Sequence, residues 1–151
     1  MATVRSATEE DIPALIMLYE QLDITEAEVE RTRNPGIGDY QRILAQIQAD
    51  PNHDLLVLEA GGEVVGSIVF LLVPNLSHHA APWALVENAI VDKRHRGKGY
   101  GRLLMKHAIE RAREAGCYKI SLTSNTVRVR AHHFYESLGF KASSHGFRMY
   151  F

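Results

Sequence analysis

The spacing of apolar residues along the chain predicts helices and strands that alternate from the N-terminus onward. Apolar positions three and four apart predict one helix after Thr8, a typical N-cap residue, and a second helix that stops at Asp50-Pro51. Between these helices, residues 24–32 have no clear period, and the glycines and proline within 31–39 are expected to break any helix. The first third of the chain is therefore expected to be mainly helical.

The rest of the chain combines β-branched apolar runs with two further helical patterns. Gly61-Gly62 separates two such runs, which predicts a β-hairpin. One predicted helix follows a glycine-rich loop and ends near Gly116, and the other covers residues 128–138. The predicted strands cover residues 3–6, 55–60, 64–73, 83–91 and 117–123, with two closing strands within 139–151. Strands interleaved with helices indicate an α/β or α+β layered sheet.

Size and composition exclude several classes of protein. A chain of 151 residues is expected to form one domain over residues 1–151. The net charge of −1 argues against nucleic acid as a partner, and one cysteine excludes an intramolecular disulfide framework. The longest apolar stretch, residues 68–74, is too short to span a bilayer, so we expect a soluble cytoplasmic protein. The eight histidines lack metal-ligand spacing, so no metal is expected.

The most informative segment is the basic, glycine-rich loop that joins the strand over 83–91 to the next helix. Gly97, Gly99 and Gly101 leave the backbone without Cβ atoms, so that several N–H groups can turn toward one anion at a helix N-terminus. A P-loop is excluded because no Ser or Thr follows Lys98. A dinucleotide-binding fingerprint is excluded because Arg102 stands where its third glycine belongs. The loop is therefore expected to bind a pyrophosphate.

Arg96, Gly99 and Gly101 resemble the Arg-x-x-Gly-x-Gly signature of the GCN5-related N-acetyltransferases, the GNAT superfamily. Other segments resemble this superfamily too, among them Glu87 to Val91 and Ala131 to Phe140, so that the resemblance extends over nearly the whole chain. It implies the GNAT fold, in which about four helices flank a mixed, mostly antiparallel sheet of about six or seven strands. It also implies acetyl-CoA as co-substrate and transfer of its acetyl group to a primary amine.

The resemblance further implies which residues bind coenzyme A. They are Ala89, Ile90, Val91, Arg96, Gly97, Lys98, Gly99, Tyr100, Gly101, Arg102, Asn125 and Phe134. Some of these side chains have a second interpretation. Arg96 could instead brace the loop, Lys98 and Arg102 could be solvated, Asn125 could be an ordinary residue at a strand end, and Phe134 could be core packing.

Acetyl transfer to an amine also needs a base and a proton donor. An alkyl amine with a pKa near 10 is neutral in about one molecule in a thousand at pH 7, so a base assists. In strict strand alternation Glu87 shares a face with Leu85 and Ala89, so its carboxylate is expected on an apolar stripe, where loss of water favours proton uptake. The alternative is that the carboxylate pairs with an arginine or faces solvent at the end of the strand. Tyr135 matches the tyrosine that relatives use as general acid, although a core role is its alternative.

The acceptor is less well defined by the sequence. Segments that resemble glucosamine 6-phosphate and aminoalkylphosphonate acetyltransferases favour a small amine that bears phosphate or phosphonate. Arg128, Arg130 and His145 are candidates to bind such a group, and His78 and His79 lie in a loop expected to border the acceptor. The alternatives are a protein or peptide amine as acceptor, and a GNAT-fold module that senses acyl-CoA without turnover. Pairing of two chains through the closing strands would give a homodimer.

Overall fold

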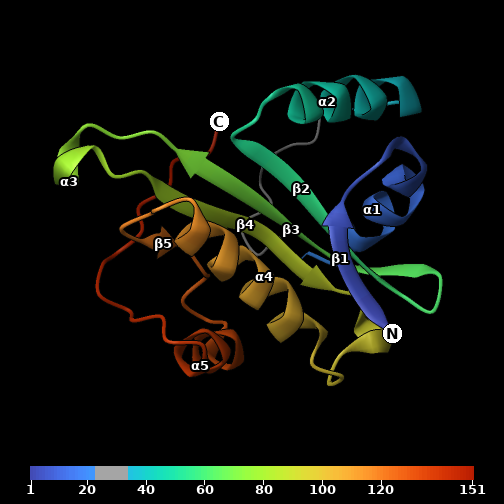
Figure 1. Ribbon diagram of the computed structural model, residues 1–151. Coiled ribbons are helices and arrows are strands. Elements are labelled where there is room, and N and C mark those ends of the chain that lie inside the picture. The colour runs from blue at the N-terminus through green and yellow to red at the C-terminus, as the bar shows by residue number, and fades with distance from the viewer. Residues whose placement is uncertain (23–33) are drawn as a thin grey trace.

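The computed structural model describes residues 1–22 and 34–151, and its centre is one five-stranded sheet in the order β1-β2-β3-β4-β5 (Figure 1). The strands are β1 (Ala2–Ser6), β2 (His53–Ala60), β3 (Glu63–Val73), β4 (Trp83–Val91) and β5 (Ile120–Ser121). β1 to β4 pair antiparallel, and β5 joins β4 in parallel. The expected mixed, mostly antiparallel sheet is confirmed, although the described residues form five strands rather than six or seven.

Helices cover both faces of this sheet (Figure 1). They are α1 (Ile12–Tyr19), α2 (Ile37–Ala49), α3 (Ser77–Ala80), α4 (Tyr100–Glu114) and α5 (Val129–Ser137), with short 3-10 turns at Glu9–Asp11 and Lys93–His95. On one face, Leu104 of α4 packs in a cluster with Leu56 and Ile68. On the other face, α1 and α2 pack against Leu55 and Val57. The alternation of side chains along β2 thus supplies both layers of the core.

Most of the predicted elements agree with these bounds, with one correction in the N-terminal third. The helix expected to stop at Asp50-Pro51 is α2, and the hairpin at Gly61-Gly62 joins β2 to β3. Residues 24–32, without clear period, lie outside the described residues. The prediction that residues 31–39 break any helix is wrong for Ile37 onward, because α2 begins there with Gly36 as its N-cap.

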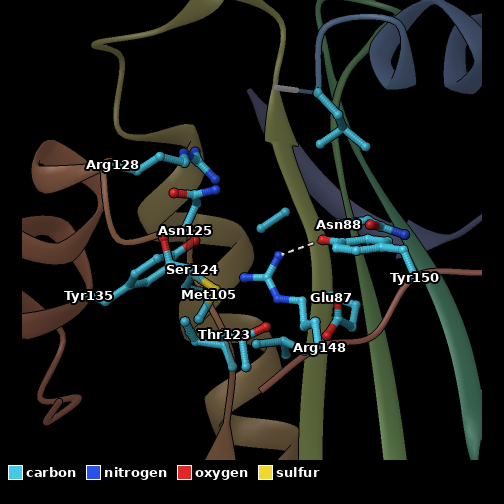
Figure 2. A pocket seen from close by; sticks show the side chains of 14 residues that line it. Glu87, Asn88, Met105, Thr123, Ser124, Asn125, Arg128, Tyr135, Arg148 and Tyr150 are labelled. Atoms are coloured by element: carbon cyan, nitrogen blue, oxygen red, sulfur yellow. Dashed lines mark hydrogen bonds between the residues drawn. The ribbon is translucent and has the colours of Figure 1, made fainter. Parts of the chain in front are cut away.

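The predicted closing strands within 139–151 are wrong, because these residues form no strand. Phe147, Met149 and Phe151 alternate along the segment, but all three side chains are exposed. The residues between them, Arg148 and Tyr150, point instead toward a cavity beside β4 (Figure 2). These two side chains therefore line a cavity instead of contributing to an additional strand pair.

A β-bulge in β4 changes the direction of the side chains around Glu87. Val69 pairs with Glu87 and Ser67 pairs with Ile90, so the pairing contains one more residue on β4 than on β3. The extra residue is accommodated at Asn88, whose φ of 51° is left-handed. Glu87 precedes the bulge and stays on the face of Leu85 and of its partner Val69, whereas the residues after the bulge exchange faces.

β4 and β5 separate soon after they meet. Their pairing is limited to Ala84 with Ile120 and Leu85 with Ser121, so the predicted strand over 117–123 is much shorter than expected. Beyond this point residues 86–89 and 122–125 face each other across a cavity. Because this space replaces sheet hydrogen bonds, the separation of the strands creates a place for a ligand between them.

Two negative findings apply to residues 1–22 and 34–151. None of their helices has the length and apolar character that a bilayer crossing requires. Nor does this part of the chain contain a group of three or more His, Cys, Asp or Glu residues arranged to hold a metal ion.

Candidate active site

The cavity between β4 and β5 has a volume of about 240 Å³ and is called the β4–β5 cavity below (Figure 2). Its walls are formed by Leu22, residues 86–89, Met105, residues 122–125, Arg128, Tyr135, Arg148 and Tyr150. Figure 2 shows the side chain of Arg148 extending into this space, where its Nη1 donates a hydrogen bond to the Tyr150 hydroxyl at 3.1 Å. Among the described residues, one carboxylate, Glu87, and two guanidinium groups, Arg128 and Arg148, therefore line this small cavity.

A second cavity of about 620 Å³ lies along the glycine-rich loop and is called the glycine-loop cavity. It is lined by residues 89–91 of β4, by most of residues 95–102, by the first turns of α4, and by α5. Leu22, Ala89, Met105, Arg128 and Tyr135 line both cavities. The two cavities are therefore adjacent, and Tyr135 lies at their junction.

The glycine-rich loop has the backbone conformation that an anion site requires. Gly97 and Gly99 have φ values of 76° and 81°, in the left-handed region, and Gly99 is the N-cap of α4. No side chain caps this helix, so N–H groups of its first turn remain without an intrahelical acceptor. A Cβ atom on Gly99 would meet no atom within 4 Å, so the glycine leaves open space where a ligand can approach. The positive end of the helix dipole adds to this preference for an anion.

The residues expected to bind coenzyme A mostly line the glycine-loop cavity, with two exceptions. The lining includes Ala89, Ile90, Val91, Arg96, Gly97, Gly99, Tyr100, Gly101, Arg102 and Phe134. Lys98 is exposed and is not part of this lining, and Asn125 lines the β4–β5 cavity instead. The amide oxygen of Asn125 accepts the Val127 N–H at 3.1 Å, which shapes the approach to α5.

Several side chains around this loop hold the structure together as well as lining the cavity. The Arg96 Nε donates to the carbonyl oxygen of Val91 at 3.1 Å, which ties the loop back to the end of β4. The Arg102 guanidinium donates to the Ser137 hydroxyl at 2.9 Å and so connects α4 to α5. Phe134 belongs to the α4 side of the core and also lies against Gly101. Arg96 can therefore both brace the loop and line the cavity, and Phe134 can both pack in the core and line it.

Glu87 lies in the β4–β5 cavity, but not in the environment that strict alternation predicts. Because of the bulge at Asn88 it does not share a face with Ala89, and its side chain is exposed rather than set in an apolar stripe. The expectation of a desolvated carboxylate is therefore wrong. An exposed carboxylate beside a cavity can instead accept a proton through water.

Tyr135 lies on α5, largely buried, with its ring 5.4 Å from that of Phe134 and 6.1 Å from that of Phe140. Burial raises the pKa of its phenol above the ordinary 10.0, Arg128 offsets part of that increase, and Glu87 adds to it. The hydroxyl therefore remains protonated well above neutral pH. A buried phenol at the junction of two cavities can donate a proton to a group that spans both.

Comparison with known proteins identifies the family. The acetyltransferase (GNAT) family profile matches residues 18–140. The chain belongs to this family. It is 32% identical over 140 residues to an aminoalkylphosphonate N-acetyltransferase from Salmonella typhimurium, a match that covers 93% of this chain and 85% of that enzyme.

Two further relatives show how far the similarity extends. A glucosamine 6-phosphate N-acetyltransferase from Trypanosoma brucei brucei is 33% identical over 88 residues, which cover 58% of this chain and 58% of that enzyme. A crystal structure described as a transcriptional regulator from Bacillus halodurans C-125 superposes with a TM-score of 0.89, at 36% identity and with 100% of each chain covered. The expected GNAT fold is therefore confirmed.

The histidines considered as acceptor contacts lie elsewhere in this GNAT domain. His78 and His79 are in α3, at positive φ values of 53° and 59°, and the His78 ring stacks on Tyr118 at 4.0 Å. His145 is exposed, and none of the three lines either cavity. The structure does not bring these histidines together with Glu87 and Tyr135.

Sequence reasoning missed the contribution of the C-terminal segment to the site. Arg148 and Tyr150 line the β4–β5 cavity, although the pattern around them predicted a strand or a dimer contact. Leu22, Ser124 and His95 were also not expected among the lining residues. The available signal was the alternation of Arg148 and Tyr150 with three apolar residues, which shows that both polar side chains share one side of an extended segment.

Proposed function

We propose that this GNAT protein transfers an acetyl group from acetyl-CoA to the primary amine of a small molecule by direct attack in a ternary complex. The observation that carries the proposal is the junction of the two cavities at Ala89 and Tyr135. One cavity has the character of an anion site, and the other contains a carboxylate. A thioester bound in the first would therefore present its carbonyl group to an amine in the second.

The donor end of the site fits coenzyme A, which the GNAT family uses as its acetylated co-substrate. The N–H groups at the start of α4 and the left-handed Gly99 favour its diphosphate. Residues 89–91 line the same cavity next to the bulge, where backbone groups of β4 are available to the pantetheine arm. Together these features support acetyl-CoA as the donor.

The proposed reaction assigns one proton transfer to each catalytic residue. Glu87 receives the proton of the attacking ammonium group, directly or through water, because only a neutral amine attacks the thioester carbonyl carbon. A C–N bond forms, the C–S bond breaks, and the positively charged nitrogen of the adduct releases its second proton to water, which leaves a neutral amide. Tyr135 gives its proton to the departing sulfur, and burial of the phenol keeps that proton in place at neutral pH.

The size of the β4–β5 cavity favours a compact acceptor. Its volume of about 240 Å³ is below the roughly 300–1,000 Å³ of pockets that enclose drug-sized ligands. The relative from Salmonella, 85% of which is covered by the match, is named for a small amine, an aminoalkylphosphonate. Both observations favour a small molecule over a protein or peptide amine.

A second function has support from one comparison. The structure from Bacillus halodurans that covers the entire chain is described as a transcriptional regulator. The alternative is therefore a module that binds acyl-CoA and responds to it without turnover. This alternative predicts that donor binding is independent of Glu87 and Tyr135.

The deciding experiment measures binding and turnover on one preparation of purified protein. Calorimetry with coenzyme A tests donor binding, and release of free thiol from acetyl-CoA is followed across a panel of primary amines. We expect amine-dependent thiol release together with formation of the acetylated amine. Binding without any amine-dependent release would establish the sensing module instead, and absence of binding would overturn both functions.

A further inference from the structure

We infer that Arg148, carried into the β4–β5 cavity by the C-terminal segment, binds an oxyanion on the acceptor, so that the acceptor is a short aminoalkyl compound with a phosphonate or phosphate group. This inference deepens the proposed function and rests on it. It makes Arg148 a specificity-determining residue, and it assigns a role to a segment that neither the motifs nor the catalytic proposal uses.

The first argument is the balance of charge in the cavity. Its lining contains two arginines, Arg128 and Arg148, and one carboxylate, Glu87. A simple alkylamine has no group that two guanidinium ions would attract, and its ammonium form would be repelled by them. An amine that also has an oxyanion places negative charge where the arginines lie, and Glu87 remains available for the amine end.

The second argument is the position of Arg148 within the cavity. Arg128 lines both cavities, so the donor can also use it, whereas Arg148 lines only the β4–β5 cavity. Figure 2 shows Arg148 reaching into the space between β4 and residues 123–125, and the Tyr150 hydroxyl accepts a hydrogen bond from its Nη1. Tyr150 thus orients a guanidinium group whose planar set of donors matches phosphate and phosphonate oxygens.

The third argument is a hydroxyl group that the fold leaves without a partner. The Oγ atom of Ser124 is buried and makes no hydrogen bond with any of the described residues, although it belongs to the lining of the same cavity. Buried hydroxyl groups in proteins nearly always have a partner, so this atom indicates a ligand with polar oxygens. An oxyanion would accept a hydrogen bond from Ser124 as well as from Arg148.

The fourth argument is the conformation of the segment that carries Arg148. Phe147 and Met149 are exposed and line neither cavity, whereas Arg148 and Tyr150, which are also exposed, line the β4–β5 cavity. Within this exposed segment the polar side chains are therefore the ones directed toward the cavity, while the apolar side chains remain in water. The segment therefore serves the site rather than the hydrophobic core.

The test compares matched amines with the wild-type chain and its variants. The amines are 2-aminoethylphosphonate, O-phosphoethanolamine, the carboxylate β-alanine and the neutral 3-amino-1-propanol. The variants are Arg148→Met, Arg148→Lys and, as a control, Arg113→Met, which removes an exposed arginine of α4 that lines neither cavity. Two readouts are collected for each variant: the dissociation constant of each amine by calorimetry in the presence of coenzyme A, and kcat/KM where turnover occurs.

We expect the wild-type protein to prefer the phosphonate and the phosphate ester over the neutral amine. In Arg148→Met this preference, expressed as a ratio of affinities, should fall at least about tenfold, since a hydrogen bond to a charged group is lost. Arg148→Lys should lose less, because it keeps the charge without the planar fork of donors. Arg113→Met should keep the wild-type ratio. A preference for β-alanine equal to that for the phosphonate would indicate a carboxylate acceptor instead.

The inference is overturned if the wild-type ratio is near one, or if Arg148→Met keeps the wild-type ratio while its melting temperature shows that it is folded. An unfolded Arg148→Met variant leaves Arg148→Lys and Ser124→Ala to decide, and an unchanged ratio in both overturns the inference as well. Loss of all turnover with every amine contradicts only the proposed catalysis, because the calorimetric ratio still reports whether Arg148 recognises the oxyanion.

Discussion

The two cavities of this GNAT domain are built in different ways. The glycine-loop cavity takes most of its lining from one nearly continuous stretch, from Ala89 to Met105. Residues of α5 add to this lining. The β4–β5 cavity collects its lining from Leu22, the β4 bulge, the chain after β5, and the C-terminal segment. One cavity is therefore local in sequence, and the other exists only after the whole chain has folded.

This difference separates two kinds of recognition. The loop offers backbone N–H groups, so its specificity depends on conformation and on the absence of side chains. The β4–β5 cavity offers Glu87, Arg148 and the hydroxyl groups of Ser124 and Tyr150, so its specificity depends on which side chains are present. We therefore expect donor binding to fail when the loop backbone is disturbed, and acceptor choice to change when single side chains are replaced.

The largest expected effect is the loss of coenzyme A binding in Gly99→Val. The φ of 81° at Gly99 is unfavourable for a β-branched residue, and the added atoms fill space left open in front of the helix N-terminus. Because each lost charge-assisted hydrogen bond weakens binding by about tenfold or more, the affinity should fall at least about 100-fold. Calorimetry with coenzyme A at a temperature where the variant is folded measures the effect.

Gly62→Val provides a matched control for backbone strain. Gly62 has a φ of 82°, a Cβ there would also meet no atom within 4 Å, and the residue lies in the hairpin between β2 and β3. Both substitutions should lower stability by a similar amount, about 1–2 kcal/mol. Only Gly99→Val should lose coenzyme A, and equal losses in both variants would show that the effect comes from general destabilisation.

The glycine-loop cavity, which is local in sequence, could also be predicted from the sequence. The glycines and the flanking strand and helix could be located from the sequence because every residue of the loop motif lies within six positions, from Arg96 to Gly101. For the same reason, the periodicity of apolar residues predicted the fold class, the hairpin, and the helices after Thr8 and before Gly116. Tyr135 was identified only through its resemblance to a family motif, since nothing in its spacing sets it apart from a core residue.

What could not be predicted depends on long-range geometry. Strict alternation placed Ala89 on the same face as Glu87, which is wrong, because a bulge at Asn88 leaves no mark in a single sequence. The two closing strands predicted within 139–151 are absent, because this segment lines a cavity with Arg148 and Tyr150 and does not pair with the sheet. Only the fold shows which surface Arg148 faces.

The second prediction concerns the junction between the cavities. Tyr135→Phe removes the proton donor but keeps the ring that packs beside Phe134 and Phe140, so kcat should fall about 100-fold. The affinity for coenzyme A should change by less than about twofold, since the backbone of the loop is untouched. Steady-state kinetics and calorimetry check the two parts. Tyr118→Phe, outside both cavities, is the control, and comparable losses of donor affinity and turnover would assign Tyr135 to binding.

The third prediction tests whether Glu87 acts as a base or only lines the β4–β5 cavity. Glu87→Gln should lower turnover at pH 7 by about tenfold or more, because the amine is then mostly protonated and nothing accepts its proton. As the pH approaches 9, more amine is already neutral, so the deficit relative to wild type should shrink. A pH series of kcat/KM with one amine measures this, with Glu136→Gln as the control. A deficit that is constant from pH 7 to 9 contradicts the role of Glu87 as the base.

The smallest expected effect lies where β4 passes into the glycine-rich loop. The Asp92 carboxylate is buried, accepts the backbone N–H of Arg94 at 2.9 Å and pairs with its guanidinium at 2.7 Å, which lowers the pKa of Asp92 from 3.8 to about 2. Because the pKa is lower in the folded state, this stabilisation is complete above about pH 4 and is lost as the pH falls toward 2.

Asp92→Asn should therefore lower the free energy of unfolding by about 1 kcal/mol at pH 7 and by much less near pH 2.5. Urea unfolding at both pH values measures this difference, and Glu114→Gln at the exposed end of α4 serves as control. Because Asp92 fixes only the start of the loop, coenzyme A affinity should fall by no more than a few fold. A loss as large as that of Gly99→Val would show that the loop depends on its anchor, and that the glycine-loop cavity is less local than its sequence indicates.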